Sequence, residues 1–160
     1  MPEPFALRDR TEADAAFLQA LYLSTREDLQ QALPDPALLQ QLVAMQQTAQ
    51  EAGFRLRFPQ ARQLLLLRSG LPIGRVVVVD TGPQALRLVD IAITPQARRS
   101  GAASAVLAAL QAHAVARGLP LCLAVAHTNH AAQSLYRKRG FATASEDDLL
   151  AQMVWQRAPA

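Results

Sequence analysis

Two arginines, a serine and a glycine stand together at Arg98–Gly101, between an apolar run that stops at Pro95 and an alanine-rich stretch. The spacing predicts that the alanine-rich stretch is a helix that begins just after the glycine. The first turn of a helix presents unpaired backbone N–H groups and about half a unit of positive charge. Gly101, Ala102 and Ala103 leave this end bare for a phosphate, and the arginines add forked donors. The segment indicates an anion-binding loop, although a surface turn with two solvated arginines has the same pattern.

A second polar pattern lies further along the chain, in the segment NHAAQSLYRKRGF at residues 129–141. Asn129 and Tyr136 are seven residues apart, which is two helical turns, so both face the same way. Gly140 suits the left-handed position that ends a helix, and Phe141 then enters the core. Taken alone, Tyr136 fits a half-buried tyrosine packed on a sheet as well as it fits a catalytic group.

Together the two segments resemble the conserved blocks of the GNAT superfamily of N-acetyltransferases. The family's acyl-CoA signature, Q/R-x-x-G-x-G/A, is matched by Arg98, Gly101 and Ala103. Its second block, Asn-x-x-Ala-x-x-Leu-Tyr-x-x-x-Gly-Phe, is matched by Asn129, Ala132, Leu135, Tyr136, Gly140 and Phe141. The resemblance implies that a loop and helix N-terminus wrap the pyrophosphate of coenzyme A, here through Gln96, Ala97, Arg98, Arg99, Ser100, Gly101, Ala102 and Ala103.

The resemblance also implies the remaining roles in a direct transfer. Asn129 would hold the pantetheine arm or nearby backbone, and Tyr136 would protonate the departing thiolate. A backbone N–H of the central strand, within Ile91, Ala92 and Ile93, would hold the thioester carbonyl, with Ile93 the best position.

A general base is harder to assign. Asp90 lies three residues before Ile93, where many relatives have an acid, but it equally fits a strand-end carboxylate paired with an arginine such as Arg87. Glu27, Asp28 and the acidic run 146–148 could attract a cationic amine, and solvated surface explains them more simply.

Other chemistries have less support in the sequence. No Gly-Lys-Ser/Thr follows the loop and the G-x-G-x-x-G spacing is missing, which excludes a Walker loop and a dinucleotide fingerprint. His127 and His130 have weak metal-ligand spacing and no third ligand, so we expect structural or capping roles and no metal. Cys122 stands alone, which excludes an internal disulfide and indicates apolar packing.

The elements that must position these residues form a single expected domain over residues 1–160. Patterning predicts an α/β fold: a mixed, mostly antiparallel sheet of six to seven strands with a central parallel βαβ pair and about four helices, in the order that the resemblance implies. N-cap patterns predict the starts of two helices, one at Thr11 with Asp14 and the other at Asp35 with Pro36. The second helix is expected to end at Gly53. The segment 54–59 reads as a short edge strand or a loop, and residues 63–80 as a hairpin. Residues 86–93 read as the central strand, with later strands at 119–126, 141–145 and 153–157 and a helix at 130–139.

The charge distribution narrows the class of ligand. The net charge is only +3, but residues 52–145 carry twelve Arg or Lys against two acids. A basic middle suits a polyanion such as coenzyme A. Few aromatic residues and no recognised binding motif argue against nucleic acid. With no signal peptide and no apolar stretch of membrane length, we expect a cytoplasmic location and no membrane partner.

The sequence therefore predicts an N-acyltransferase that moves an acetyl group from acetyl-CoA to an amine by direct attack. The acceptor could be a small amine, an amino acid, an antibiotic or a protein N-terminus, and a homodimer is possible. The alternative is a GNAT-like module that binds coenzyme A as a sensor without transfer.

Overall fold

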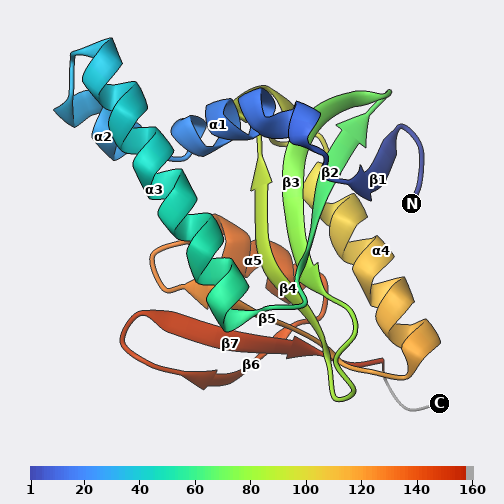
Figure 1. Cartoon of the computed structure of the whole chain (residues 1–160). Coiled ribbons are helices and arrows are strands. Elements are labelled where there is room, and N and C mark those ends of the chain that lie inside the picture. The colour runs from blue at the N-terminus through green and yellow to red at the C-terminus, as the bar shows by residue number, and fades with distance from the viewer. Residues whose placement is uncertain (158–160) are drawn as a thin grey trace.

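A seven-stranded sheet in the order β1-β2-β3-β4-β5-β7-β6 forms the centre of the molecule (Figure 1). The structure is a computed structural model that describes residues 1–157. All neighbouring strands are antiparallel except β4 and β5, which confirms the predicted fold class. The strands are β1 (Phe5–Asp9), β2 (Arg62–Arg68), β3 (Leu71–Val79), β4 (Leu86–Ile93), β5 (Leu121–Ala126), β6 (Ala142–Glu146) and β7 (Leu150–Trp155).

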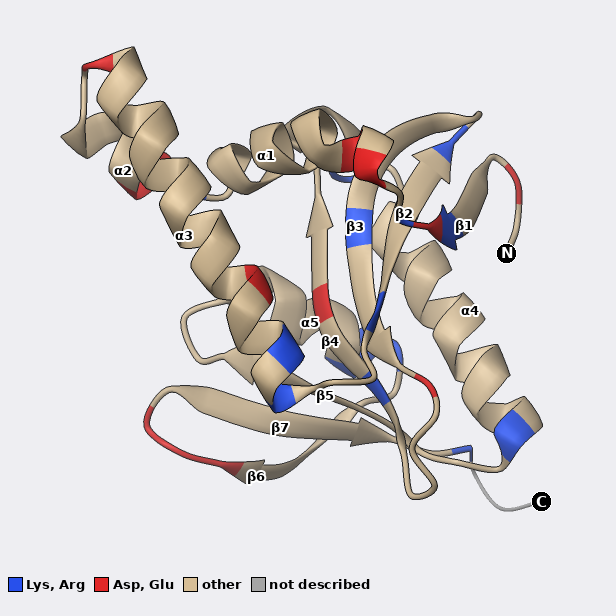
Figure 2. Ribbon diagram, viewed as in Figure 1, with Lys and Arg blue, Asp and Glu red and all other residues tan. Residues whose placement is uncertain are grey.

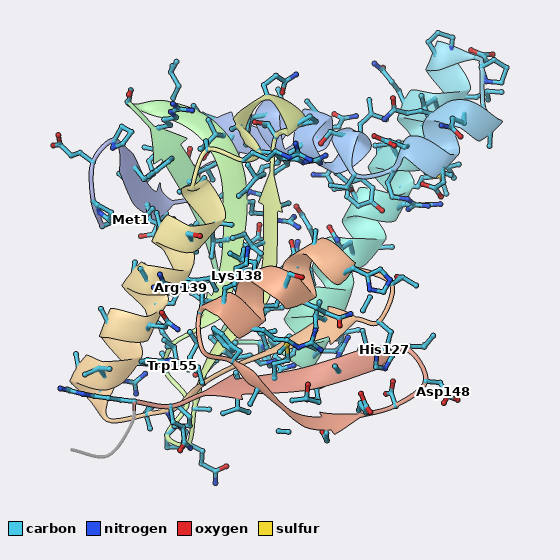
Figure 3. The ribbon with its side chains drawn as sticks, turned by 180° about the vertical axis from the view of Figure 1, so that it is seen from behind. Met1, His127, Lys138, Arg139, Asp148 and Trp155 are labelled. Carbon is cyan, nitrogen blue, oxygen red and sulfur yellow. The ribbon has the colours of Figure 1, made fainter. Side chains whose placement is uncertain are left out.

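Residues 1–157 contain five α-helices, and all but α2 cover the two faces of this sheet. They are α1 (Ala15–Ser24), α2 (Glu27–Ala32), α3 (Pro36–Arg57), α4 (Ala102–Arg117) and α5 (His130–Lys138). α1 and α3 lie in front of the sheet in Figure 1, and α4 and α5 lie on the opposite face, which Figure 3 turns toward the reader. The main core lies under α4 and α5, and a smaller cluster of Leu18, Leu21 and Leu65 lies under α1. No helix within residues 1–157 is long and apolar enough to cross a membrane.

Helix starts follow the predicted signals, whereas one predicted helix end is wrong. The Asp35 carboxylate accepts a hydrogen bond from the Ala37 N–H at 3.0 Å, with Pro36 in the first turn. α3 does not close at Gly53 but continues to Arg57, so the segment 54–59 is mostly helix rather than strand or loop. Gly53 lies in the helix interior without a positive φ, and no proline follows until Pro59. The segment around Glu27 and Asp28 forms the additional short helix α2.

A bulge in β4 changes which face its residues occupy. Val77 pairs with Asp90 and Val78 with Leu88, so Val89 is skipped in the register. Before the bulge Leu86 and Leu88 pack into the main core, and after it Ile91 and Ile93 do so. Asp90 therefore shares the α1 side with Ala92, which packs against the α1 cluster. Without the bulge, strict alternation from Leu86 and Leu88 would place the Asp90 carboxylate in the main core.

β4 and β5 separate soon after they begin to pair. The parallel pairing joins only Leu86–Leu88 to Leu121–Leu123, although β4 runs on to Ile93 and β5 to Ala126. Figure 1 shows β4 continuing toward α1 while β5 turns away. The unpaired parts of the two strands define a region without backbone pairing, here called the β4–β5 gap, whose β4 side is formed by residues 89–93.

Gly74 in β3 and Gly53 in α3 should respond oppositely to alanine substitution. A Cβ on Gly74 would lie 2.5 Å from the Ala92 carbonyl oxygen, so Gly74→Ala must push β3 from β4 beside Ile93. We expect it to lower the free energy of unfolding by about 1–3 kcal/mol. A Cβ on Gly53 meets nothing within 4 Å, so Gly53→Ala should raise the free energy of unfolding by about 0.5–1 kcal/mol. Urea unfolding of both variants measures these changes, and equal effects would contradict the contact at Gly74.

Candidate active site

The loop before α4 has a backbone conformation that lets a ligand come close to its main chain. Gly101 has φ +84° and Arg99 has φ +61°, both in the left-handed region. The Ser100 hydroxyl donates to the Ala97 carbonyl at 2.5 Å, which closes the turn. A Cβ added at Gly101 would meet nothing within 4 Å, so the space in front of the helix is open and glycine is needed there for its conformation.

A cavity of about 420 Å³, here called the loop cavity, lies against this loop and the first turn of α4. Seven of the predicted coenzyme A residues line it, together with Ala131, Ala132 and Leu135 of α5. Gln96 lies on the loop and is exposed, and Gln96 and Ser100 do not line the cavity. The lining residues are Ile93, Ala97, Arg98, Arg99, Gly101, Ala102, Ala103, Ser104, Ala131, Ala132 and Leu135.

A smaller pocket of about 130 Å³, here called the tyrosine pocket, lies at the β4–β5 gap. Asp90, Ile91, Asn129 and Tyr136 all line it, so the predicted common direction of Asn129 and Tyr136 is found. The Asn129 side chain also caps α5 by accepting the Ala132 N–H at 3.2 Å. Burial, followed by the negative charge of Asp90, raises the pKa of the Tyr136 phenol above its ordinary value. This phenol therefore keeps its proton at neutral pH and can act as a donor.

The backbone N–H of Ile93 faces the β4–β5 gap. The Thr94 N–H donates to the Ile73 carbonyl of β3 at 2.8 Å, and backbone groups alternate in direction along a strand. Ile93 must then point its N–H and carbonyl away from β3, and its carbonyl accepts a hydrogen bond from Arg98 Nε at 3.4 Å. Ile91 has the same direction, while Ala92 points its carbonyl toward Gly74 of β3.

On the other side of the sheet, a pocket of about 470 Å³ lies beneath α1 and α3; we call it the α1 pocket. It shares Asp90, Ile91 and Asn129 with the tyrosine pocket, and Ile93, Arg98 and Ala131 with the loop cavity. Because they share lining residues, the three spaces adjoin one another from the α4 loop past the β4–β5 gap to α1, and we call this row of spaces the passage. The α1 pocket is lined by Leu18, Leu21, Tyr22, Thr25, Gln50, Arg75, Asp90, Ile91, Ala92, Ile93, Arg98, Asn129 and Ala131.

Asp90 is paired with Arg75, and not with Arg87 as the sequence suggested. Arg75 Nη2 donates to Asp90 Oδ2 at 2.5 Å. Figure 2 shows that β3 carries a basic position and β4 an acidic one. The Arg87 guanidinium lies over the Phe58 ring at 5.4 Å and donates to Gln152 at 3.2 Å. Within residues 1–157, Asp90 Oδ1 makes no hydrogen bond, which leaves it free for a ligand.

The other candidates from the sequence lie outside this passage. Asp28 pairs with Arg26 at 3.0 Å on α2, and neither Glu27 nor Asp28 lines the α1 pocket. Asp147 of the 146–148 run accepts the N–H groups of Leu149 and Leu150, and its carbonyl lies 2.7 Å from His127 Nε2, near the β6–β7 turn (Figure 3). In the described part of the chain, no three His, Cys, Asp or Glu side chains are grouped as a metal site.

Three residues that line the α1 pocket, Tyr22, Gln50 and Arg75, were not among the site residues predicted from the sequence. Of these three, only Arg75 could have been found from the sequence, because it is a lone charge inside the apolar segment Ile73–Val79. A charge in such a run needs a partner when it is buried, and an arginine there points to a neighbouring acid.

Comparison with known proteins identifies the fold and the family. The profile of the family described as "Acetyltransferase (GNAT) family" matches residues 16–141. The PaiA N-acetyltransferase of Thermoplasma acidophilum, solved with coenzyme A, shares 14% identity at a TM-score of 0.67, covering 96% of this chain and 99% of that one. The spermidine N-acetyltransferase of Vibrio cholerae, solved with coenzyme A and spermine, shares 17% identity at a TM-score of 0.67, covering 96% of each chain.

A third solved structure is more similar in sequence over a shorter stretch. Nourseothricin acetyltransferase shares 27% identity at a TM-score of 0.52, covering 60% of this chain and 65% of that one. No curated protein sequence matches the chain.

Proposed function

Because the chain belongs to the acetyltransferase (GNAT) family, we propose that it transfers an acetyl group from acetyl-CoA to the amine of a small molecule. The observation that carries this proposal is the row of adjoining spaces at the β4–β5 gap, with an open loop before α4 at one end and a separate pocket beneath α1 at the other. Solved structures of the same fold include spermidine acetyltransferases, which supports a small-molecule amine as the acceptor.

The loop cavity fits the phosphate end of acetyl-CoA. The left-handed backbone at Arg99 and Gly101 and the open space before α4 present the first N–H groups of the helix to a pyrophosphate. Arg98 and Arg99 add charged donors at the rim. Asn129 and the small side chains Ala131 and Ala132 would line the path of the pantetheine arm toward the gap.

The residues at the gap are arranged for direct transfer. Acetyl-CoA supplies the acetyl group as a thioester; transfer forms a C–N bond to the amine and breaks the C–S bond. The Ile93 N–H would donate to the acetyl carbonyl oxygen and stabilise the negative charge that develops there. Asp90 Oδ1 would take the proton that the amine loses, directly or through one water, and pass it to solvent. Tyr136 would donate its phenolic proton to the departing sulfur and recover a proton from solvent.

Thiol release from acetyl-CoA in the presence of a panel of amines tests the function. We expect release that depends on both substrates, together with an amine product heavier by one acetyl group in mass spectrometry. Protein that binds acetyl-CoA tightly, yet acetylates none of the amines or protein N-termini supplied, would instead be a coenzyme A-binding module. Protein that does not bind acetyl-CoA would contradict both functions.

A further inference from the structure

The α1 pocket contains a buried arginine whose hydrogen-bonding capacity is only partly used. We propose that the acceptor carries a carboxylate close to its amine, as an amino acid does, and that Arg75 binds this carboxylate while Asp90 receives the amine. The inference rests on the proposed acetyl transfer and names the class of acceptor for that same site.

Arg75 is held in place by three neighbouring side chains. Its side chain is 5% exposed, with Nη2 donating to Asp90 at 2.5 Å and to Gln50 of α3 at 3.4 Å. The guanidinium lies 5.7 Å from the centre of the Phe54 ring, also on α3. A guanidinium fixed by two helical side chains and one strand carboxylate is preorganised, so binding an anion there costs little side-chain entropy.

The remaining donors of Arg75 have no protein acceptor. Nε is buried and unpartnered, and within residues 1–157 Nη1 makes no hydrogen bond. A buried donor without a partner is costly, and native proteins rarely retain one without a use. Nε is also buried and unpartnered in Arg87 and Arg139, but Arg75 lines the α1 pocket, so a ligand there can accept a hydrogen bond from its Nη1. A carboxylate oxygen in that position would make a charge-assisted hydrogen bond to the guanidinium.

The charges around the α1 pocket disfavour a polycationic acceptor. Arg75, Arg98 and Asp90 are the charged residues that line it, giving two cations and one acid. Asp28, a nearby acid on α2, is already paired with Arg26 and does not line the pocket. A polyamine would need several carboxylates. Because Arg98 is assigned to the coenzyme A phosphates, Arg75 and Asp90 remain for the acceptor, and they match one carboxylate and one ammonium.

The Arg75–Asp90 pair matches the two charges of an amino acid. Arginine and aspartate stand side by side on adjacent strands, and an amino acid bears its ammonium and carboxylate on one carbon. Asp90 uses only Oδ2 for Arg75, which leaves Oδ1 for the ammonium at the edge shared with the tyrosine pocket. The amine would then enter the gap where the Ile93 N–H holds the acetyl carbonyl.

Matched acceptors test the carboxylate directly in the wild-type protein. Thiol release from acetyl-CoA is measured with free L-amino acids, with the carboxamide of each, and with spermidine. We expect the preferred amino acid to exceed its own carboxamide by about 10- to 100-fold in kcat/KM, as befits a hydrogen bond between charged groups. Higher kcat/KM for the carboxamides or for spermidine would overturn the inference.

The variant Arg75→Gln should remove this preference by raising KM for the amino acid far more than for its carboxamide. Arg87→Gln is the matched control, because Arg87 is also a strand arginine against a phenylalanine ring but does not line the α1 pocket. Arg87→Gln should keep the wild-type ratio of kcat/KM for the amino acid to kcat/KM for its carboxamide. Arg75→Gln protein that still binds acetyl-CoA and keeps the preference would overturn the inference, since Arg75 would then act only on Asp90 or on stability.

A binding measurement on the wild-type protein tests the carboxylate site even if Arg75→Gln does not fold. In the wild-type complex with coenzyme A, N-acetyl amino acids should raise the thermal midpoint, and their carboxamides should not. If the wild-type protein binds acetyl-CoA but neither acetylates nor binds any carboxylated compound, the proposed carboxylate-binding role of Arg75 is refuted. The acetyltransferase proposal would still stand. Failure to bind acetyl-CoA refutes that proposal itself.

Discussion

Tyr136→Phe should lower kcat by about 10²- to 10⁴-fold, the usual contribution of a general acid, while the affinity for acetyl-CoA stays near the wild-type value. The substitution removes one oxygen from a side chain that is 7% exposed and keeps the ring contact with Phe141 at 5.7 Å between centroids. Burial and the charge of Asp90 both raise the pKa of this phenol, so it remains protonated at neutral and mildly alkaline pH. Wild-type kcat should therefore not fall between about pH 7 and 9 through loss of this proton.

Steady-state kinetics, with acetyl-CoA titrated separately by calorimetry, measures this effect. The thermal midpoint of Tyr136→Phe is the control, because an unchanged midpoint assigns the loss to chemistry. A kcat within a factor of three of wild type would contradict the acid role and leave Tyr136 as a packed tyrosine of α5.

Gly101→Glu should weaken acetyl-CoA binding by about 100-fold or more. It places an L side chain at φ +84° and a negative charge at the end of α4 where the pyrophosphate should lie. The strain costs about 1–2 kcal/mol of stability, and the charge opposes the phosphates in addition. Loss of one or two charged hydrogen bonds to a ligand corresponds to about a 100-fold change in affinity.

Gly118→Glu provides a matched control at the other end of the same helix. Gly118 is also left-handed, at φ +66°, and caps the C-terminus of α4 outside the loop cavity. Both variants should lose stability, but only Gly101→Glu should lose affinity in calorimetric titration. Equal losses of affinity in the two variants would mean that general destabilisation, and not the loop, is responsible.

The features that sequence analysis predicted well are local ones. The α4 loop, the caps at Asp35 and Asn129, and the left-handed Gly140 each depend on a few consecutive residues whose chemistry is specific. The same holds for the common direction of Asn129 and Tyr136, because helical periodicity fixes it. A single sequence contains this information without knowledge of the remote parts of the chain.

The features that were missed depend on strand register and tertiary contacts. Arg75 and Asp90 are fifteen residues apart and meet only because β3 pairs with β4 through a bulge at Val89. The sequence offered Arg87, nearer in the chain, as the partner. Gly53 looked like a helix end, but α3 continues to Arg57, and Phe54 in this last part of the helix contacts Arg75 of β3. The acceptor side is built from such contacts, so its chemistry could be inferred only from the structure.

A crystal structure of the protein with a non-hydrolysable acetyl-CoA analogue tests the central claim most directly, through the position of the acyl carbonyl. We expect the acyl oxygen of the analogue to lie within hydrogen-bonding distance of the Ile93 N–H, with the acetyl group entering the α1 pocket. The position of the thioester sulfur should be beside Tyr136, and the pyrophosphate should lie on residues 98–103. An analogue bound outside the β4–β5 gap, or with its pyrophosphate away from the α4 loop, would contradict the account.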